Sequence, residues 1–153
     1  VESAAEMLEA VRSVAGDADA LVSAAAIGDF TVDAAPEKIR SGGTLTLEFE
    51  PTPKLIDSVR EEHPELPIVG FKLETAGDDE AMIEKARETL ERAGLAFVVA
   101  NDASVMGSEA TRVIVVSDGE ATVHEGGKEE IGGRIADALG DTIARGGSPV
   151  AED

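Results

Sequence analysis

Three short apolar runs alternate along the sequence with segments of helical periodicity, and they span residues 20–26, 67–74 and 96–102. Each run has the length of a strand rather than of a buried helix. Strands that alternate with helices pair in parallel, because each helix carries the chain back across the sheet in a right-handed crossover. The pattern therefore predicts an α/β fold, in which 20–26 is a core strand buried on both faces.

Local signals mark the ends of the predicted helices. Ser3 opens a capping-box pattern before the first helix. Thr52 followed by Pro53 predicts the start of the second, with Thr52 as the N-cap and the proline at the first helical position. Asp78 is the predicted N-cap of the third helix, which we expect to end at Gly94.

An antiparallel edge is predicted beside the parallel strands. Residues 112–117 and 121–125 flank Asp118-Gly119, a turn pair typical of β-hairpins, and a final helix follows this hairpin. The earlier segment 44–50 alternates strictly between polar and apolar residues. This alternation predicts a half-exposed or edge strand.

One domain accounts for the whole pattern. With 153 residues, the chain is long enough to bury about two thirds of the surface that its unfolded form exposes. We predict a three-layer, Rossmann-like α/β domain over residues 1–144, with a parallel sheet and an antiparallel hairpin edge. Residues 145–153 are expected to form a loose tail.

The charge balance excludes several classes of partner. The chain carries 32 Asp and Glu against 13 Lys and Arg, so its net charge is -19. Such a charge repels nucleic acids and anionic membranes, and no apolar run approaches the roughly 20 residues that span a bilayer. Because cysteine is absent, a reducing cytoplasm is the expected compartment. The acids are spread along the chain and lysine is scarce, which favours a halophilic cytoplasm.

Ligands of parallel α/β sheets bind beyond the carboxyl ends of the strands. This rule selects Asp29 after the first apolar run, Phe71 near the end of the second, and Asn101-Asp102 at the end of the third. Asp29 either binds a ribose, a base or a hydrated metal ion, or forms a turn. Phe71 either packs on a nucleobase or fills the core, and Asn101-Asp102 either bind a base or sugar or cap a loop.

Two further features suit an anion. Lys38 lies in a loop before Gly42 and Gly43, where an ammonium group either neutralises a phosphate or stays solvated. The predicted helix start at 52–54 presents free N–H groups and the positive end of the helix dipole, as every helix start does. The two histidines lack partners at metal-ligand spacing, and the sequence has no glycine-rich dinucleotide motif or P-loop.

Six strings follow one another along the chain: AAAIGDF, PEKIR, TPKLI, VGFKLET, VVAND and RVIVV. Through them, residues 3–143 resemble the phosphopantothenate–cysteine ligase (phosphopantothenoylcysteine synthetase) family. In bacteria and archaea this ligase is usually the C-terminal half of a two-domain flavoprotein of coenzyme A biosynthesis. The resemblance implies an enzyme that joins 4′-phosphopantothenate to cysteine with CTP and Mg²⁺, through an acyl-cytidylate. FMN is expected only in the fused decarboxylase domain, outside this chain.

The resemblance also implies roles for particular residues. Asp29 and Lys38 match catalytic positions, and Lys38 matches a loop lysine that serves acyl-cytidylate formation. The loop that holds Lys38 is expected to close over the phosphates as a flap. The predicted nucleotide-binding residues are Ser23, Ala24, Ala25, Asp29, Lys38, Pro53, Lys54, Leu55, Ile56, Phe71, Lys85, Arg92 and Asn101.

The sequence departs from the family pattern at several places. Thr52 and Lys54 flank Pro53 where the family usually has Asn and Asp, Lys72 replaces a usual Ala, and Thr111 replaces a usual Asn. The family's glycine-rich strand-turn-helix and its Asn-x-Ser-Ser-Gly segment do not occur in this sequence. The predicted ligase domain is therefore partial, and its activity alone is left open. The resemblance further implies a homodimer that shares its active sites.

Two other functions stay open at this point. An NAD(P)-binding Rossmann-type domain requires a glycine fingerprint that this sequence lacks. The second alternative is a non-catalytic relative of the ligase, which has the same sequence motifs but does not turn over a substrate. The nucleotide is CTP in the prokaryotic branch of the family and ATP in the eukaryotic branch, and the halophilic composition favours CTP. The metal ligands are left unassigned.

Overall fold

The structure is a computed structural model that describes residues 1–33, 35, 37–40, 42–74, 78–102 and 110–146. Its elements, in chain order, are α1 (Ala4–Ala15), β1 (Leu21–Ser23), β2 (Phe30–Thr31), β3 (Glu50–Pro51), α2 (Leu55–Glu62), β4 (Ile68–Glu74), α3 (Asp79–Ala93), β5 (Phe97–Asp102), β6 (Ala110–Ser117), β7 (Glu120–Gly127) and α4 (Lys128–Ala144). Most of the predicted tail, from residue 147 onward, lies outside the described residues.

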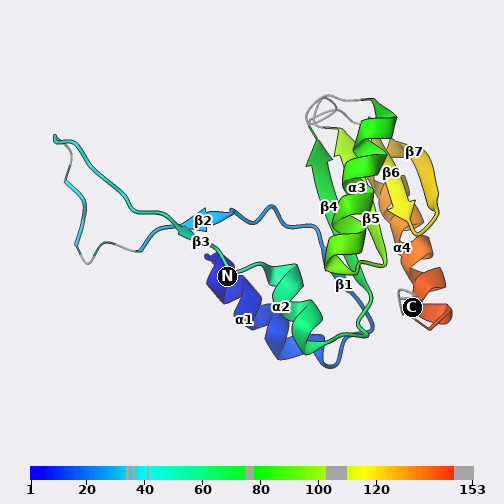
Figure 1. Ribbon diagram of the computed structural model, residues 1–153, viewed down its shortest axis with the longest axis horizontal. Helices are drawn as coiled ribbons and strands as arrows, with labels where there is room; N and C mark the ends of the chain where they lie inside the picture. The colour runs from blue at the N-terminus through cyan, green and yellow to red at the C-terminus, as the bar shows by residue number, and fades with distance from the viewer. Residues whose placement is uncertain (34, 36, 41, 75–77, 103–109, 147–153) are drawn as a thin grey trace.

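A five-stranded sheet organises the chain, in the order β1-β4-β5-β6-β7 (Figure 1). Strands β1, β4 and β5 are parallel, while β6 and β7 run antiparallel beside them. The predicted parallel sheet with an antiparallel hairpin edge is therefore confirmed. The hairpin turns at Asp118-Gly119, where Gly119 has a φ of 74°. Glycine suits this left-handed backbone because it has no Cβ to clash.

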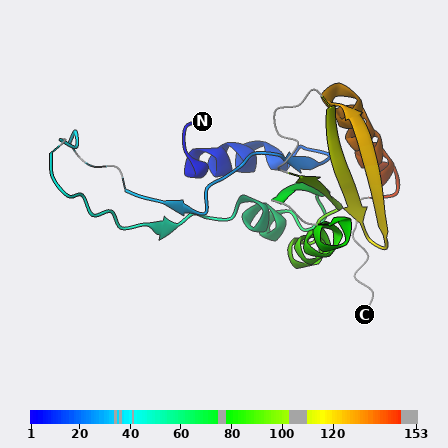
Figure 2. The same ribbon diagram turned by 90° about the horizontal axis from the view of Figure 1, so that it is seen from above.

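Helices cover both faces of the sheet. On one face, α1, α2 and α3 enclose a cluster that includes Ile68 and Val98. On the other face, α4 adds Ile131 to a second cluster that includes Val99. Figure 2 shows α4 and α3 on opposite sides of the β6–β7 hairpin. Neighbouring residues of β5 thus serve different clusters, since successive side chains of a strand point to opposite faces.

Most of the predicted helix ends are confirmed. Ser3 and Glu6 form the capping box, in which Glu6 N donates to Ser3 Oγ at 3.1 Å and Ser3 N donates to Glu6 Oε2 at 3.3 Å. Asp78 Oδ1 accepts a hydrogen bond from Ala81 N at 2.9 Å, and Gly94 ends α3 with a left-handed backbone. These signals act within one helical turn, so the local sequence is sufficient to specify them.

The predicted start of α2 is wrong. The helix begins at Leu55 with Lys54 as its N-cap, and no side chain caps it. Thr52 is instead buried, and its N–H donates to the backbone oxygen of Asp29 at 2.9 Å. This bond continues the pairing of β2 with β3 by one step. A contact with a distant part of the chain therefore holds Thr52 extended, against its local preference for a helix cap.

Strand β1 is shorter and more exposed than predicted. It covers only Leu21–Ser23 and pairs with β4 alone, so it is an edge strand of the described sheet. Leu21 packs against the cluster beneath α1, α2 and α3, but Val22, which points to the other face, is 45% exposed. Helix α4 lies over β6 and β7 rather than over β1. The prediction that 20–26 is buried on both faces is therefore wrong.

The predicted strand at 44–50 is mostly not formed. Only Glu50 joins β3, which pairs with β2 through two residue pairs. Beyond this short pairing, the described residues of 32–49, here called the arm, extend away from the sheet (Figures 1 and 2). The apolar members of the alternating pattern are exposed: Leu45, Leu47 and Phe49. Within the described chain, no second strand covers them, so the alternation has no partner.

Gly70 provides a test of the core of the sheet. A Cβ at this position of β4 would lie 2.7 Å from Cδ1 of the buried Leu95. We expect Gly70→Ala to lower the free energy of unfolding by about 1–3 kcal/mol, because an overpacked core forces its side chains or backbone to shift. Urea denaturation measures this change.

Gly132→Ala is the matched control, because a Cβ at this position of α4 meets no atom within 4 Å. Alanine favours a helix over glycine, so this change should raise the free energy of unfolding by about 0.5–1 kcal/mol. Equal effects of the two substitutions would contradict the close packing of β4 against Leu95.

Candidate functional site

The parallel strands β1, β4 and β5 end at one side of the sheet, here called the carboxyl edge. The register pairs Leu73 of β4 with Asn101 of β5, so the ends of these two strands lie side by side. Ser23 ends β1 half-buried, and the exposed Ala24 and Ala25 follow it. The structure thus brings the ends of the three predicted strands to one edge, as the parallel order requires.

Phe71 and Asn101 share one face of the carboxyl edge. Val69 and Val99 belong to the cluster beneath α4. Phe71 and Asn101 each come two residues later in the same strands, so they point to that same face. Phe71 pairs with Val99 and is therefore a diagonal neighbour of Asn101. Because Phe71 is 37% exposed, its interpretation as a core residue is wrong.

The side-chain oxygen of Asn101 has no partner among the described residues. Oδ1 is buried and accepts no hydrogen bond. An unsatisfied buried polar atom costs about 1–3 kcal/mol, so native proteins keep few of them without a ligand, an ion or a water molecule. An amide oxygen only accepts hydrogen bonds. Any group that pairs with this atom has to be an N–H or O–H donor.

Asp29 and Lys54 lie together beside the short β2–β3 pairing. Lys54 Nζ donates to Asp29 Oδ1 in an exposed, hydrogen-bonded ion pair. The hydrogen bond and the charge of Lys54 lower the pKa of Asp29, and the charge of Lys72 lowers it further. Asp29 is therefore ionised at neutral pH. Two ammonium groups and one carboxylate form a locally cationic group on a strongly acidic chain.

Lys38 lies in the arm, with an exposed side chain. The arm points away from the sheet in both views (Figures 1 and 2). The structure does not bring Lys38 together with the Asp29–Lys54 pair. The predicted closure of Lys38 over a phosphate requires the arm to move or to reach a second molecule, and it stays a prediction.

At the start of α2, backbone N–H groups are more accessible to a ligand than the side chains are. Pro53 is exposed, but Leu55 is buried and Ile56 packs against the same core cluster. Their side chains are therefore unavailable to a ligand. The first N–H groups of a helix have no partner within the helix, so these are the groups that an anion can reach.

Helix α3 separates two of the predicted residues from the carboxyl edge. It carries the chain from the end of β4 back to the start of β5, so its last turn lies at the opposite side of the sheet. Arg92 is in this last turn, and its Nη1 is 3.3 Å from Asp57 Oδ1 of α2. Lys85 is exposed near the middle of α3. The predicted contact of Arg92 with a triphosphate does not fit this position.

A cavity of about 370 Å³ lies away from the carboxyl edge, between the β6–β7 hairpin and α4, and it contains none of the predicted site residues. Its lining mixes acidic and basic side chains and includes His124, Arg134 and Asp137. Over the described ranges, no group of three or more His, Cys, Asp or Glu side chains is arranged to hold a metal ion. No helix in that part of the chain combines the length and the apolar character that a membrane crossing needs.

The sequence does not predict two features of the site. One is the ion pair between Asp29 and Lys54, and the other is the lack of a described hydrogen-bond partner for Asn101 Oδ1. Both residues of the pair were selected separately, but their contact joins positions 25 apart and depends on the β2–β3 pairing. The burial of Asn101 Oδ1 depends on the neighbouring strands. No local pattern signals either feature.

Comparison with known proteins identifies the family. Residues 1–142 match the family model described as "DNA/pantothenate metabolism flavoprotein C-terminal domain". The "Coenzyme A biosynthesis bifunctional protein CoaBC" of Thermococcus kodakarensis is 49% identical over 119 residues, which cover 76% of this chain but 30% of the relative.

Two solved structures share the fold. The DNA/pantothenate metabolism flavoprotein from Streptococcus pneumoniae has a TM-score of 0.80 at 21% identity, over 92% of this chain and 71% of that one. A Cab2 variant in complex with phosphopantothenate-cysteine has a TM-score of 0.72 at 23% identity, over 93% of this chain and 52% of that one. The chain spans less than a third of the curated relative's length. With the family model matched over residues 1–142, the chain belongs to the DNA/pantothenate metabolism flavoprotein C-terminal domain family.

Proposed function

We propose that this chain is the nucleotide-binding part of a phosphopantothenate–cysteine ligase and that its nucleotide is CTP. Membership of the family supports the proposal, as does a neighbour of the same fold in complex with phosphopantothenate-cysteine. The structural observation that carries it is the buried Oδ1 of Asn101, which has no partner among the described residues and lies diagonal in the strand register to the exposed Phe71. An aromatic face and a hydrogen-bond acceptor together suit a nucleobase that carries an amino group.

The proposed reaction has two balanced steps. The carboxylate of 4′-phosphopantothenate attacks the α-phosphorus of CTP, a P–O bond forms, and pyrophosphate leaves with the electrons of the broken P–O bond. The amine of cysteine then attacks the acyl carbon, loses a proton and displaces CMP. The protein has to hold two anions close together, so positioning and cationic groups are its main contributions.

The described residues divide this work. Phe71 provides a surface for the base, and Asn101 Oδ1 accepts from the amino group of cytosine. Lys54, held by the ionised Asp29, places a positive charge for the phosphates. Mg²⁺ would bind the nucleotide phosphates, whose oxygens are the ligands it prefers, and would supply charge stabilisation there.

The arm supports a homodimer with shared sites as part of this proposal. Its apolar side chains are exposed, and the arm, which includes Lys38, extends away from the sheet (Figure 1). In the proposed dimer, a second copy of the chain covers the exposed Leu45, Leu47 and Phe49, and Lys38 of one copy enters the nucleotide site of the other. The net charge of -19 further supports work in concentrated salt, where screening weakens the repulsion between two acidic chains.

The first test is a titration of the ¹⁵N-labelled chain with CTP in molar KCl. Asn101 is the only Asn and the chain has no Gln, so its side-chain amide yields a unique pair of signals. We expect CTP to shift this pair. Asp29→Ala and Lys54→Met should each weaken binding about fivefold to tenfold, which corresponds to the loss of one charge-assisted contact.

Arg12→Met is the control for these substitutions. It also removes a cation from an exposed ion pair, because Arg12 Nη2 lies 2.6 Å from Glu62 Oε1, but this pair joins α1 to α2. CTP binding by Arg12→Met should equal that of the unmodified chain. Binding of NAD in place of CTP would support a dinucleotide-binding domain instead, and a folded chain that binds none of CTP, ATP or NAD would contradict the proposal.

A second test addresses the homodimer. We expect sedimentation in molar KCl to show a dimer for the unmodified chain and a monomer for Leu47→Asp, because a charge cannot be buried in an apolar interface without cost. Val14→Asp is the matched control, since Val14 is equally apolar and 61% exposed on α1, outside the arm. A monomeric unmodified chain, or loss of the dimer in both variants, would refute assembly through the arm.

A further inference from the structure

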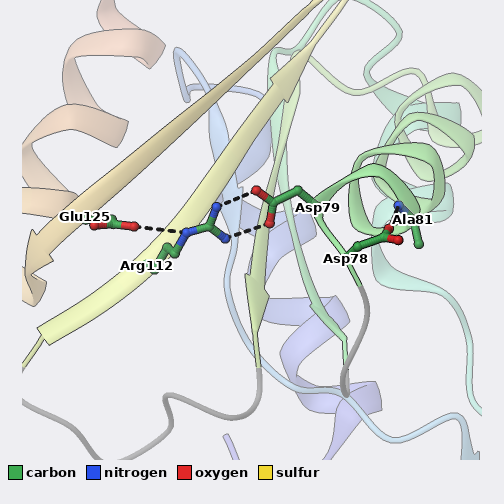
Figure 3. Close-up of polar contacts among 5 residues, drawn as sticks. All are labelled: Asp78, Asp79, Ala81, Arg112 and Glu125. Carbon is green, nitrogen blue, oxygen red and sulfur yellow. Dashed lines mark hydrogen bonds and ion pairs between the residues drawn. The ribbon is translucent and has the colours of Figure 1, made fainter.

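Arg112 connects three elements at the carboxyl edge. Its Nη1 and Nη2 donate to Oδ1 and Oδ2 of Asp79 at 2.9 and 2.6 Å, and its Nε donates to Glu125 Oε1 at 3.1 Å (Figure 3). Asp79 is the first residue of α3, and Glu125 lies opposite Arg112 in the β6–β7 register. The planar guanidinium thus ties a helix start to two strands, in the two-bonded geometry that makes arginine–carboxylate pairs strong.

The position of Arg112 along the strand connects it with Asn101. The next residue, Val113, pairs with Asn101, and this pair is the last one described at the carboxyl end of the β5–β6 ladder. Arg112 and Asn101 point to opposite faces of the sheet, because Asn101 shares its face with Val113. Arg112 therefore does not contact the region of the ligand around Asn101, but it anchors the strand that supports Asn101 from the side.

The positive charge of Arg112 also separates two carboxylates. Asp79 above all, and then Glu125, raise the pKa of Arg112, so the guanidinium stays charged. The Arg112 side chain is only 30% exposed, which protects its pairs from part of the screening by salt. Without the guanidinium, two carboxylates from different elements face each other near Asp78, the N-cap of α3. Their repulsion acts directly on the junction of α3, β6 and β7.

We propose that Arg112 is a positioning residue of the nucleotide site, which holds Asn101 in place by locking the start of β6 to the start of α3. The proposal rests on the proposed function for its ligand, CTP. It differs from a purely structural role because it predicts an effect on the side-chain amide of Asn101 and on nucleotide affinity in a protein that is still folded.

The test compares the full chain with Arg112→Met, Arg112→Lys and Arg134→Met in molar KCl. Arg134→Met is the control for the loss of a paired guanidinium: Arg134 pairs with a single carboxylate, Glu130 Oε1 at 3.5 Å, within α4, and it lines the cavity between α4 and the hairpin. Two signals are measured: the unique side-chain amide pair of Asn101 without ligand, and the Kd for CTP. Asp79→Ala removes the two-bonded partner of Arg112 without adding a second side-chain amide, and it provides a second route to the same loss.

We expect Arg112→Met to shift the Asn101 amide pair before any ligand is added and to raise the Kd for CTP about tenfold. Arg112→Lys keeps the charge but loses the two-bonded geometry, so its Kd should rise less, about twofold to threefold. Asp79→Ala should shift the Asn101 pair in the same direction as Arg112→Met, because it removes the two-bonded partner of the guanidinium. Arg134→Met should leave both signals unchanged.

The inference is overturned if Arg112→Met and Asp79→Ala leave the ligand-free Asn101 amide pair where it is, or if Arg134→Met changes it equally. Failure of the proposed function is a separate result, in which the unmodified chain does not bind CTP. In that case the ligand-free shift still decides whether Arg112 positions Asn101. If Arg112→Met does not fold, Arg112→Lys and Asp79→Ala decide the question by the same two signals.

Discussion

The parallel pairing of β4 with β5 is the contact on which the core and the site both depend. It runs from Val69 beside Phe97 to Glu74 beside Asp102. Along this ladder, alternate side chains enter the cluster under α1, α2 and α3 or the cluster under α4, so one pairing holds three layers together. The same alternation continues past the buried part of the strands, where it turns Phe71 and Asn101 to one face.

Electrostatics in this chain are governed by the shortage of cations. With 13 basic residues against 32 acidic ones, each lysine or arginine near the carboxyl edge is one of few cations on a strongly negative chain. Lys54 is fixed by Asp29, and Arg112 by Asp79 and Glu125. The first pair leaves a cation beside a carboxylate at the surface, where an incoming phosphate can compete for it. The Arg112 group joins three elements, α3, β6 and β7, and therefore fixes their relative positions.

Features that depend on neighbours within a helical turn or a hairpin could be predicted from the sequence. The Ser3 capping box, the Asp78 cap and the Asp118-Gly119 turn are of this kind. Features that depend on distant partners could not. The backbone bond to Asp29 overrides the helix signal at Thr52, and the exposure of Val22 follows from its place at the sheet edge. A single arginine in a strand has no pattern at all, so only the fold shows what Arg112 joins.

The short pairing of β2 with β3 makes the arm a narrow excursion from the body of the fold. Its two residue pairs, with the Asp29–Thr52 backbone bond beneath them, close the excursion where both ends re-enter the structure. The entropy of closing a loop grows only with the logarithm of its length. Insertions and deletions in the arm therefore cost little stability, and evolution can alter the reach of the arm and its apolar side chains while the sheet remains the same.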